Sequence, residues 1–244
     1  DNLKMEYKRA ASLFLDALFP RRCPVCGDIV MPPGKLICPG CQGRLSFVKS
    51  PVCKKCGKEI LSEYQEYCFD CTRHRRSFEY GIALLNYNEA AGASMAAVKY
   101  KNRREYLDFY ADEAVRRLGS EFEAMRADCL IPVPVHPKRY RSRGFNQALV
   151  LAQKLGEKTG IPVCSDILKR SRNTEPQKEL GPSARLKNLE KAFTAEKIPP
   201  GLERVILVDD IYTTGSTAEA CTRALKAAGV KNVYFFAVCI GQGQ

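Results

Sequence analysis

The sequence lacks the features of an exported or membrane-spanning protein. Its 244 residues contain no run that approaches the roughly 20 apolar residues a helix needs to cross a bilayer. The opening segment has no basic start, no unbroken apolar stretch and no small-residue cleavage site, so it does not resemble a signal peptide. We therefore expect a cytoplasmic protein, with peripheral attachment at the inner face of the membrane as the alternative.

The sequence also lacks the G-x4-G-K-[ST] motif with which P-loop ATPases hold phosphates. Its two Gly-Lys pairs, at residues 34–35 and 57–58, are followed by leucine and glutamate. This absence argues against reading the acidic strand end near residue 209 as the Mg²⁺-binding strand of such an ATPase. The hydrophobic content of 45% is ordinary, and the length suits one α/β domain and a smaller module.

Eight of the twelve cysteines form a regular series near the N-terminus. They make four C-x2-C pairs with 11 residues between successive pairs, which is a spacing typical of zinc ligands in a reducing compartment. A segment of about 50 residues is too small to fold by burial alone, whereas structural zinc contributes on the order of 10–16 kcal/mol. We predict two structural tetrathiolate zinc sites with the ligands Cys23, Cys26, Cys38, Cys41, Cys53, Cys56, Cys68 and Cys71.

The predicted double zinc ribbon occupies residues 23–76, and several of its properties stay open. Sequential pairing of the cysteines is the simplest, but crossed pairing and an iron–sulfur centre are also compatible with the pattern. The ribbons could serve as a docking or nucleic-acid-contacting module or as a scaffold for the following domain. Ahead of them, apolar residues at helical spacing predict an amphipathic helix within residues 1–22, which packs on the protein or contacts a membrane surface or a partner.

The net charge of +12 is unevenly distributed along the chain. Residues 137–193 carry 13 Lys and Arg against 5 Asp and Glu, whereas residues 194–244 carry 5 against 5. An excess of positive charge in one segment favours a polyanionic ligand there.

From residue 77 to residue 244, predicted strands and helices alternate. The expected order is strand 79–87, helices 90–100 and 104–119, strand 129–135, helix 146–160, strand 204–210, helix 217–229 and strand 232–240. This alternation predicts an α/β domain with a mostly parallel sheet flanked by helices. Ligands of such sheets bind beyond the carboxyl ends of the strands.

Residues 205–217, VILVDDIYTTGST, combine two chemical features at one such strand end. The adjacent carboxylates of Asp209 and Asp210 suit a vicinal diol. The following loop offers hydroxyls and backbone N–H groups at a helix N-terminus, where phosphate dianions bind. We therefore predict recognition of a ribose 5-phosphate, with a phosphate loop made of Thr213, Thr214, Gly215, Ser216 and Thr217.

A second charged motif follows the strand at 129–135. We expect a loop there, with the next helix beginning near Phe145. Four cations within six residues make a clamp for pyrophosphate plausible, with a solvated basic loop as the alternative. The residues of this predicted clamp are Lys138, Arg139, Arg141 and Arg143.

These motifs together carry a resemblance to a known family. Residues 205–217 are similar to the phosphoribosyl pyrophosphate signature of type I phosphoribosyltransferases. The whole chain resembles the ComF/GntX family of competence-associated phosphoribosyltransferase-like proteins, with further support from residues 19–27, 133–147 and 174–193. The resemblance implies a type I phosphoribosyltransferase fold at 77–244. It places Asp209 and Asp210 at the ribose hydroxyls of the catalytic site.

The resemblance also implies a hood over the reacting centre, formed by the polar residues 171–193. Its predicted lining residues are Arg172, Thr174, Gln177, Arg185 and Asn188. The expected activity is a Mg²⁺-dependent transfer from phosphoribosyl pyrophosphate to an acceptor that the sequence does not identify. The alternatives are a single-stranded DNA-binding factor that works with DNA-uptake machinery, and a sensor of phosphoribosyl pyrophosphate without turnover.

Overall fold

The computed structural model describes residues 20–170 and 192–241. Most of the helix predicted within residues 1–22 lies outside this part of the chain. The five predicted hood residues, Arg172, Thr174, Gln177, Arg185 and Asn188, lie outside it as well. No helix in the two described ranges combines the length and the apolarity needed to cross a membrane.

The central sheet is parallel and has the strand order β1-β6-β5-β2. Its strands are β1 (Gly81–Asn86), β2 (Cys129–Pro132), β5 (Arg204–Tyr212) and β6 (Asn232–Ile240). β1, β2 and β6 are buried along nearly their whole length, as expected for strands covered on both faces. Because the strands are parallel, their carboxyl ends meet at one edge of the sheet, as the sequence predicts.

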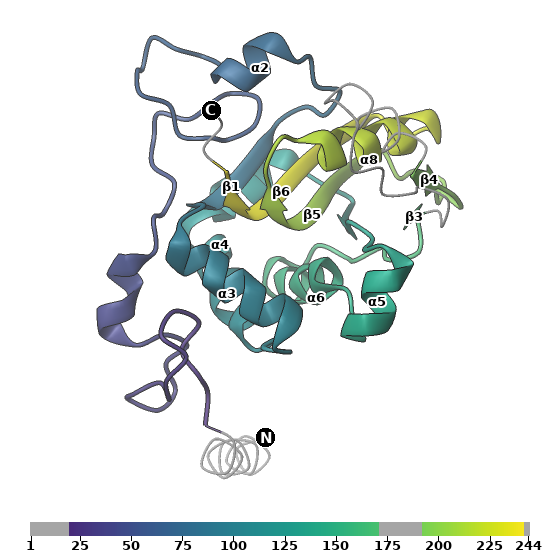
Figure 1. The fold of residues 1–244 in the computed structure, drawn as a ribbon. Coiled ribbons are helices and arrows are strands. Elements are labelled where there is room, and N and C mark those ends of the chain that lie inside the picture. The colour runs from purple at the N-terminus through teal and green to yellow at the C-terminus, as the bar shows by residue number, and fades with distance from the viewer. Residues whose placement is uncertain (1–19, 171–191, 242–244) are drawn as a thin grey trace, which may run out of the picture.

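Helices cover both faces of the sheet (Figure 1). The helices α3 (Glu89–Tyr100), α4 (Tyr106–Met125) and α6 (Gln147–Thr159) enclose one apolar core with residues such as Ile206 and Phe236. The helix α8 (Ser216–Ala227) encloses a second core on the opposite face, with Leu207 and Phe235. The domain is therefore a three-layer α/β structure.

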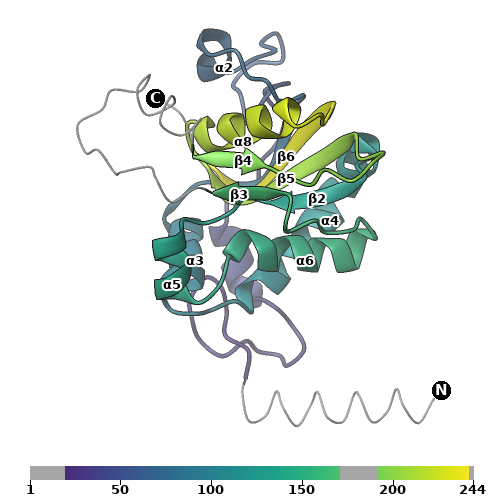
Figure 2. The same ribbon diagram turned by 90° about the vertical axis from the view of Figure 1, so that its right-hand side faces the viewer.

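A small antiparallel sheet lies beside α8 (Figure 2). It consists of β3 (Leu168–Arg170) and β4 (Phe193–Ala195), and Arg170 pairs with Phe193. This pairing holds the chain just before residue 171 close to the chain just after residue 191.

The two ribbons lie on opposite sides of the central sheet (Figure 1). The first, which contains the short 3₁₀ helix η1 (Pro39–Arg44), packs Val25, Leu36 and Ile37 against the core under α3 and α4. The second, which contains α2 (Phe69–Arg73), contributes its buried cysteines to the core under α8.

Several predicted elements differ from the structure, and three of the differences lie at the carboxyl ends of the strands. The basic segment after β2 is the helix α5 (Pro137–Arg143), where we expected a loop. Pro137 favours a helix start because its φ is already helical, and His136 Nδ1 accepts from Lys138 N at 3.2 Å. β2 ends at Pro132 instead of residue 135, and β5 continues to Tyr212, where it still pairs with Ile240 of β6.

Candidate functional site

The eight cysteines form two groups of four, and within each group the sulfur atoms lie within 4.8 Å of one another. The groups are sequential: residues 23, 26, 38 and 41, and residues 53, 56, 68 and 71. The sulfurs of Cys26 and Cys38 are 3.9 Å apart, and those of Cys56 and Cys68 are 3.6 Å apart. A tetrahedron with Zn–S bonds of about 2.3 Å has sulfur–sulfur edges of about 3.8 Å. Four thiolates at this spacing fit two closed, structural zinc sites.

The two zinc sites differ in burial. In the first, Cys26 is exposed and Cys38 and Cys41 are half-buried. In the second, Cys53, Cys56 and Cys68 are all buried and only Cys71 is half-buried. The second site is therefore part of the molecular interior, while the first lies near solvent.

Asp209 and Asp210 lie near the end of β5, inside the strand predicted for residues 204–210. Alternate residues of a strand point to opposite faces of the sheet. Asp210 accordingly faces the layer of α3 and α6, and Asp209 faces the layer of α8. The two side chains therefore leave β5 on opposite faces, although Asp209 Oδ1 still accepts a hydrogen bond from Asp210 N at 2.9 Å.

Asp210 is held by residues from two helices. It accepts a hydrogen bond from Gln147 Nε2 at 2.9 Å and forms an ion pair with Lys99. Arg143 of α5 donates in turn to Gln147 Oε1, so this network connects the basic helix with the strand end. Sequence reasoning missed Lys99 and Gln147, because no local motif marks a residue that acts from a distant helix.

Asp209 is half-buried and lines a pocket with Tyr212, Gly215 and Thr217. Burial, and secondarily the charge of Asp210, raise the pKa of Asp209 well above its usual value. A carboxylate in this position gains from a ligand hydroxyl or a cation that favours its charged form.

The predicted phosphate loop, residues 213–217, forms a tight turn onto α8. Gly215 has φ of +75°, and a Cβ added there would lie 2.1 Å from the Tyr212 hydroxyl, so glycine is required. Thr214 Oγ1 and Ser216 Oγ are 2.9 Å apart and share a hydrogen bond. Ser216 and Thr217 begin the helix, where free N–H groups and the helix dipole favour an anion.

The four predicted clamp residues do not all face the same way. Arg139 and Arg143 are four residues apart and thus share one face of α5. Arg141 instead lines a separate pocket with Tyr140, and Lys138 is exposed.

Arg170 at the end of β3 is a further cation near the site that sequence reasoning missed. Burial and the nearby charge of Arg139 lower the pKa of Arg170, while the charge of Asp209 opposes this shift. In the sequence, the one indication of a role for Arg170 is its position directly before the predicted hood.

Three arginines around the site have a buried Nε atom without a hydrogen-bond partner among the described residues. They are Arg143 of α5, Arg170 of β3 and Arg76, whose Nη2 donates to Thr214 O at 2.5 Å. Buried polar groups normally have partners, and arginine pairs best with phosphate and carboxylate. Three such donors around one strand end fit a ligand with several anionic groups.

Comparisons with known proteins find matches for both the zinc-ribbon module and the α/β domain. Residues 14–72 match the double zinc ribbon domain, and residues 141–244 match the phosphoribosyl transferase domain. The chain is 30% identical over 225 residues to competence protein F of Haemophilus influenzae, which covers 88% of this chain and 95% of that protein.

Two further relatives match along most of their length. Competence protein ComFC of Bacillus subtilis is 26% identical over 233 residues, covering 90% of this chain and 92% of that protein. DNA utilization protein YhgH of Escherichia coli K12 is 25% identical over 210 residues, covering 83% and 89%. The structure has two tetracysteine sites ahead of a parallel sheet of the phosphoribosyltransferase type, and the relatives match along most of the chain. The chain therefore belongs to the ComF family.

Proposed function

We propose that this protein binds phosphoribosyl pyrophosphate with Mg²⁺ and transfers its phosphoribosyl group to an acceptor. The observation that carries the proposal is the convergence, at one edge of the sheet, of a carboxylate, a phosphate loop and three arginines with unused buried donors. A ribose with a phosphate at C5′ and a pyrophosphate at C1′ presents a matching set of hydroxyls and anions.

Each group has a role in the proposed complex. Asp209 accepts hydrogen bonds from the ribose hydroxyls, and Asp210 supports it from the other face of β5 through its contacts with Lys99 and Gln147. The phosphate loop, residues 213–217, binds the 5′-phosphate. Arg139 and Arg143 stabilise pyrophosphate as it leaves, together with Arg170.

Magnesium fits the donor set, because Asp209 and the ligand's phosphates offer only oxygen atoms, which Mg²⁺ prefers. When bound, Mg²⁺ would neutralise charge on the pyrophosphate. In the proposed reaction the bond between C1′ and the pyrophosphate oxygen breaks, and a bond between C1′ and the acceptor nucleophile forms. The protein's own part is to hold the ribose and to stabilise the leaving anion.

Calorimetry tests the binding step. Phosphoribosyl pyrophosphate is titrated into the protein with and without Mg²⁺, and binding is expected only with the ion. Asp209→Asn is expected to weaken binding at least tenfold, whereas Asp166→Asn, an exposed aspartate that lines the neighbouring pocket, serves as the matched control. Equal affinity of the wild type and Asp209→Asn would contradict the proposed role of the carboxylate.

Turnover needs its own measurement. Pyrophosphate release is followed across a panel of bases, amines and nucleic acids, and one acceptor is expected to stimulate it. Tight binding of phosphoribosyl pyrophosphate with no release for any acceptor would identify a sensor instead of a transferase.

A second candidate function is the handling of single-stranded DNA during uptake. It is favoured by the excess positive charge at residues 137–193, by the exposed cations on α5 and by the names of the relatives, which refer to competence and DNA utilization. Affinity for an oligonucleotide is expected to fall steeply with rising salt, because phosphate contacts release counterions. Competition by phosphoribosyl pyrophosphate would show that both ligands use one site.

A further inference from the structure

The second ribbon contacts the central sheet through its backbone. Gly81 N of β1 donates to Lys55 O at 2.9 Å, within the turn that joins Cys53 and Cys56. A Cβ added at Gly57 would lie 2.5 Å from Gly81 O, and Gly57 has φ of +73°. Only glycine allows this close approach, so the turn that holds two zinc ligands is fixed against the edge strand.

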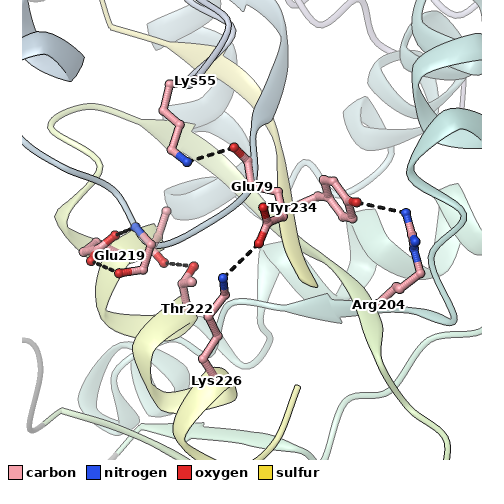
Figure 3. Close-up of polar contacts among 9 residues, drawn as sticks. Lys55, Glu79, Arg204, Glu219, Thr222, Lys226 and Tyr234 are labelled. Carbon is pink, nitrogen blue, oxygen red and sulfur yellow. Dashed lines mark hydrogen bonds and ion pairs between the residues drawn. The ribbon is translucent and has the colours of Figure 1, made fainter. Parts of the chain in front are cut away.

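Side chains extend this contact from the ribbon to α8 (Figure 3). Lys55 Nζ donates to the backbone carbonyl of Glu79 at 2.9 Å, and Lys226 of α8 binds the Glu79 carboxylate at 2.9 Å. Glu219 of α8 is 1% exposed and accepts from both the backbone N and the Oγ of Ser77, each at 2.7 Å. The segment that leaves the second ribbon is thus attached to the helix whose first turn completes the phosphate loop.

Arg76 makes the last connection. It lies five residues after the zinc ligand Cys71, and its Nη2 donates to Thr214 O within the phosphate loop at 2.5 Å. Below the loop, Tyr212 stacks on Phe235 with ring centroids 4.7 Å apart, and Phe78 meets the same ring edge-on at 5.0 Å. These rings belong to the apolar cluster that contains Cys53, Cys56 and Cys68.

The first ribbon has no comparable route to the phosphate loop among the described residues. Its partly buried side chains pack on the opposite face of the sheet, against the core under α3 and α4. Just before this ribbon, Arg21 forms an ion pair with Asp108 of α4 at 2.7 Å, on the side of the sheet away from α8. Among the described residues, contacts therefore connect the second zinc site, but not the first, with the phosphate loop.

We propose that the second tetracysteine site is a structural part of the anion-binding site, with Arg76 as a positioning residue that fixes the phosphate loop. The proposal rests on the proposed function for the identity of the ligand. Loss of metal from the second site releases Arg76 and the ring stack beneath Gly215, so the loop loses its binding geometry. Loss of metal from the first site leaves the loop in place.

Two matched double variants test the difference between the sites. Cys68→Ser/Cys71→Ser removes two ligands of the second site, and Cys38→Ser/Cys41→Ser removes the corresponding ligands of the first. Zinc content is measured for each, followed by hydrogen exchange of residues 212–217 without ligand. Faster exchange in this segment is expected for the second-site variant only. Equal exchange in the two variants would overturn the proposal.

A milder pair keeps the test valid if the second-site variant fails to fold. Arg76→Ala removes the contact with Thr214, while Arg75→Ala removes an exposed neighbouring cation of equal charge. Arg76→Ala is expected to speed exchange in residues 212–217 and to weaken binding of ribose 5-phosphate about tenfold, as for loss of a charged hydrogen bond. Arg75→Ala is expected to change neither, and both variants should keep their full zinc content. Indistinguishable exchange in the two variants would refute the role of Arg76.

The exchange measurement separates this proposal from the proposed function. If the wild type binds neither ribose 5-phosphate nor phosphoribosyl pyrophosphate, the proposed function fails, and the exchange rates of the free proteins still decide whether the second site supports the loop. If the wild type binds these ligands and both pairs of variants behave alike, the coupling fails and the proposed function stands.

Discussion

Burial raises the pKa of Asp209 well above its usual value, and the nearby charge of Asp210 adds to the effect. Between the pKa of this carboxyl in the unfolded chain and its higher pKa in the folded protein, the folded state holds more protons. The free energy of unfolding therefore falls as the pH rises through this window. The charged carboxylate that a ligand would need is thus maintained at a cost to stability.

The first prediction concerns Asp209→Asn, which cannot ionise. We expect the variant to lack this part of the pH-dependent decline, so its free energy of unfolding should exceed that of the wild type by a margin that grows as the pH rises through this window. Urea unfolding at a series of pH values from about 4 to about 8 checks both points. A variant less stable than the wild type at pH 7 would show that the carboxylate supports the fold.

The second prediction concerns Asp210, for which the opposite result is expected. Its side chain is 5% exposed and is paired with Lys99, which is 19% exposed. Asp210→Asn leaves that ammonium group without its partner, so we expect a loss of about 3 kcal/mol in the free energy of unfolding. The double variant Lys99→Met/Asp210→Asn should recover part of the loss in the same unfolding assay. Simple additivity of the two single changes would rule out a direct interaction.

At the scale of elements, α5 determines which cations can act together. The sequence predicts a basic loop, in which four neighbouring charges would be equivalent. A helix separates them, because residues four apart share a face while residues two apart do not. Arg143 thereby reaches Gln147 of α6, whereas Arg141 lines another pocket with Tyr140.

The third prediction follows from this division. Arg143→Ala is expected to weaken pyrophosphate binding about tenfold or more, since a charge-assisted hydrogen bond is lost. Arg141→Ala, which removes the same charge from the same helix, is expected to change the affinity less than about twofold if α5 acts through one face. Calorimetric titration with pyrophosphate and Mg²⁺ compares the two variants. Equal losses would indicate that α5 acts through its net charge alone.

At the scale of the whole molecule, the sequence predicts the layers and the two modules well. Hydrophobic periodicity locates the strands of the central sheet, and the cysteine spacing locates both zinc sites, since these signals are local. The contact of Arg76 with Thr214, the ion pair of Lys99 with Asp210 and the unequal burial of the two zinc sites are not predictable in this way. The two contacts join residues that are more than a hundred positions apart, and the unequal burial depends on how each ribbon packs on the sheet, so no local pattern encodes them.

The fourth prediction concerns removal of both metals. Because the cysteines of the first site are more exposed, a chelator should extract one equivalent of zinc quickly and the second slowly. A chromogenic chelator resolves the two phases, and Cys38→Ser/Cys41→Ser should lose the fast one. Release in a single phase, or loss of the slow phase in that variant, would contradict the assignment.

The strand order has a consequence for synthesis on the ribosome. β1 is the first strand of the sheet to be made, but its neighbour is β6, the last of the described strands. The second ribbon can bind zinc as soon as its cysteines have been translated. The edge of β1 beside it stays unpaired until β6 has been translated and inserted between β1 and β5. A nascent chain that stops shortly before β6 would carry finished ribbons and an open sheet, which makes it a natural substrate for chaperones and proteases.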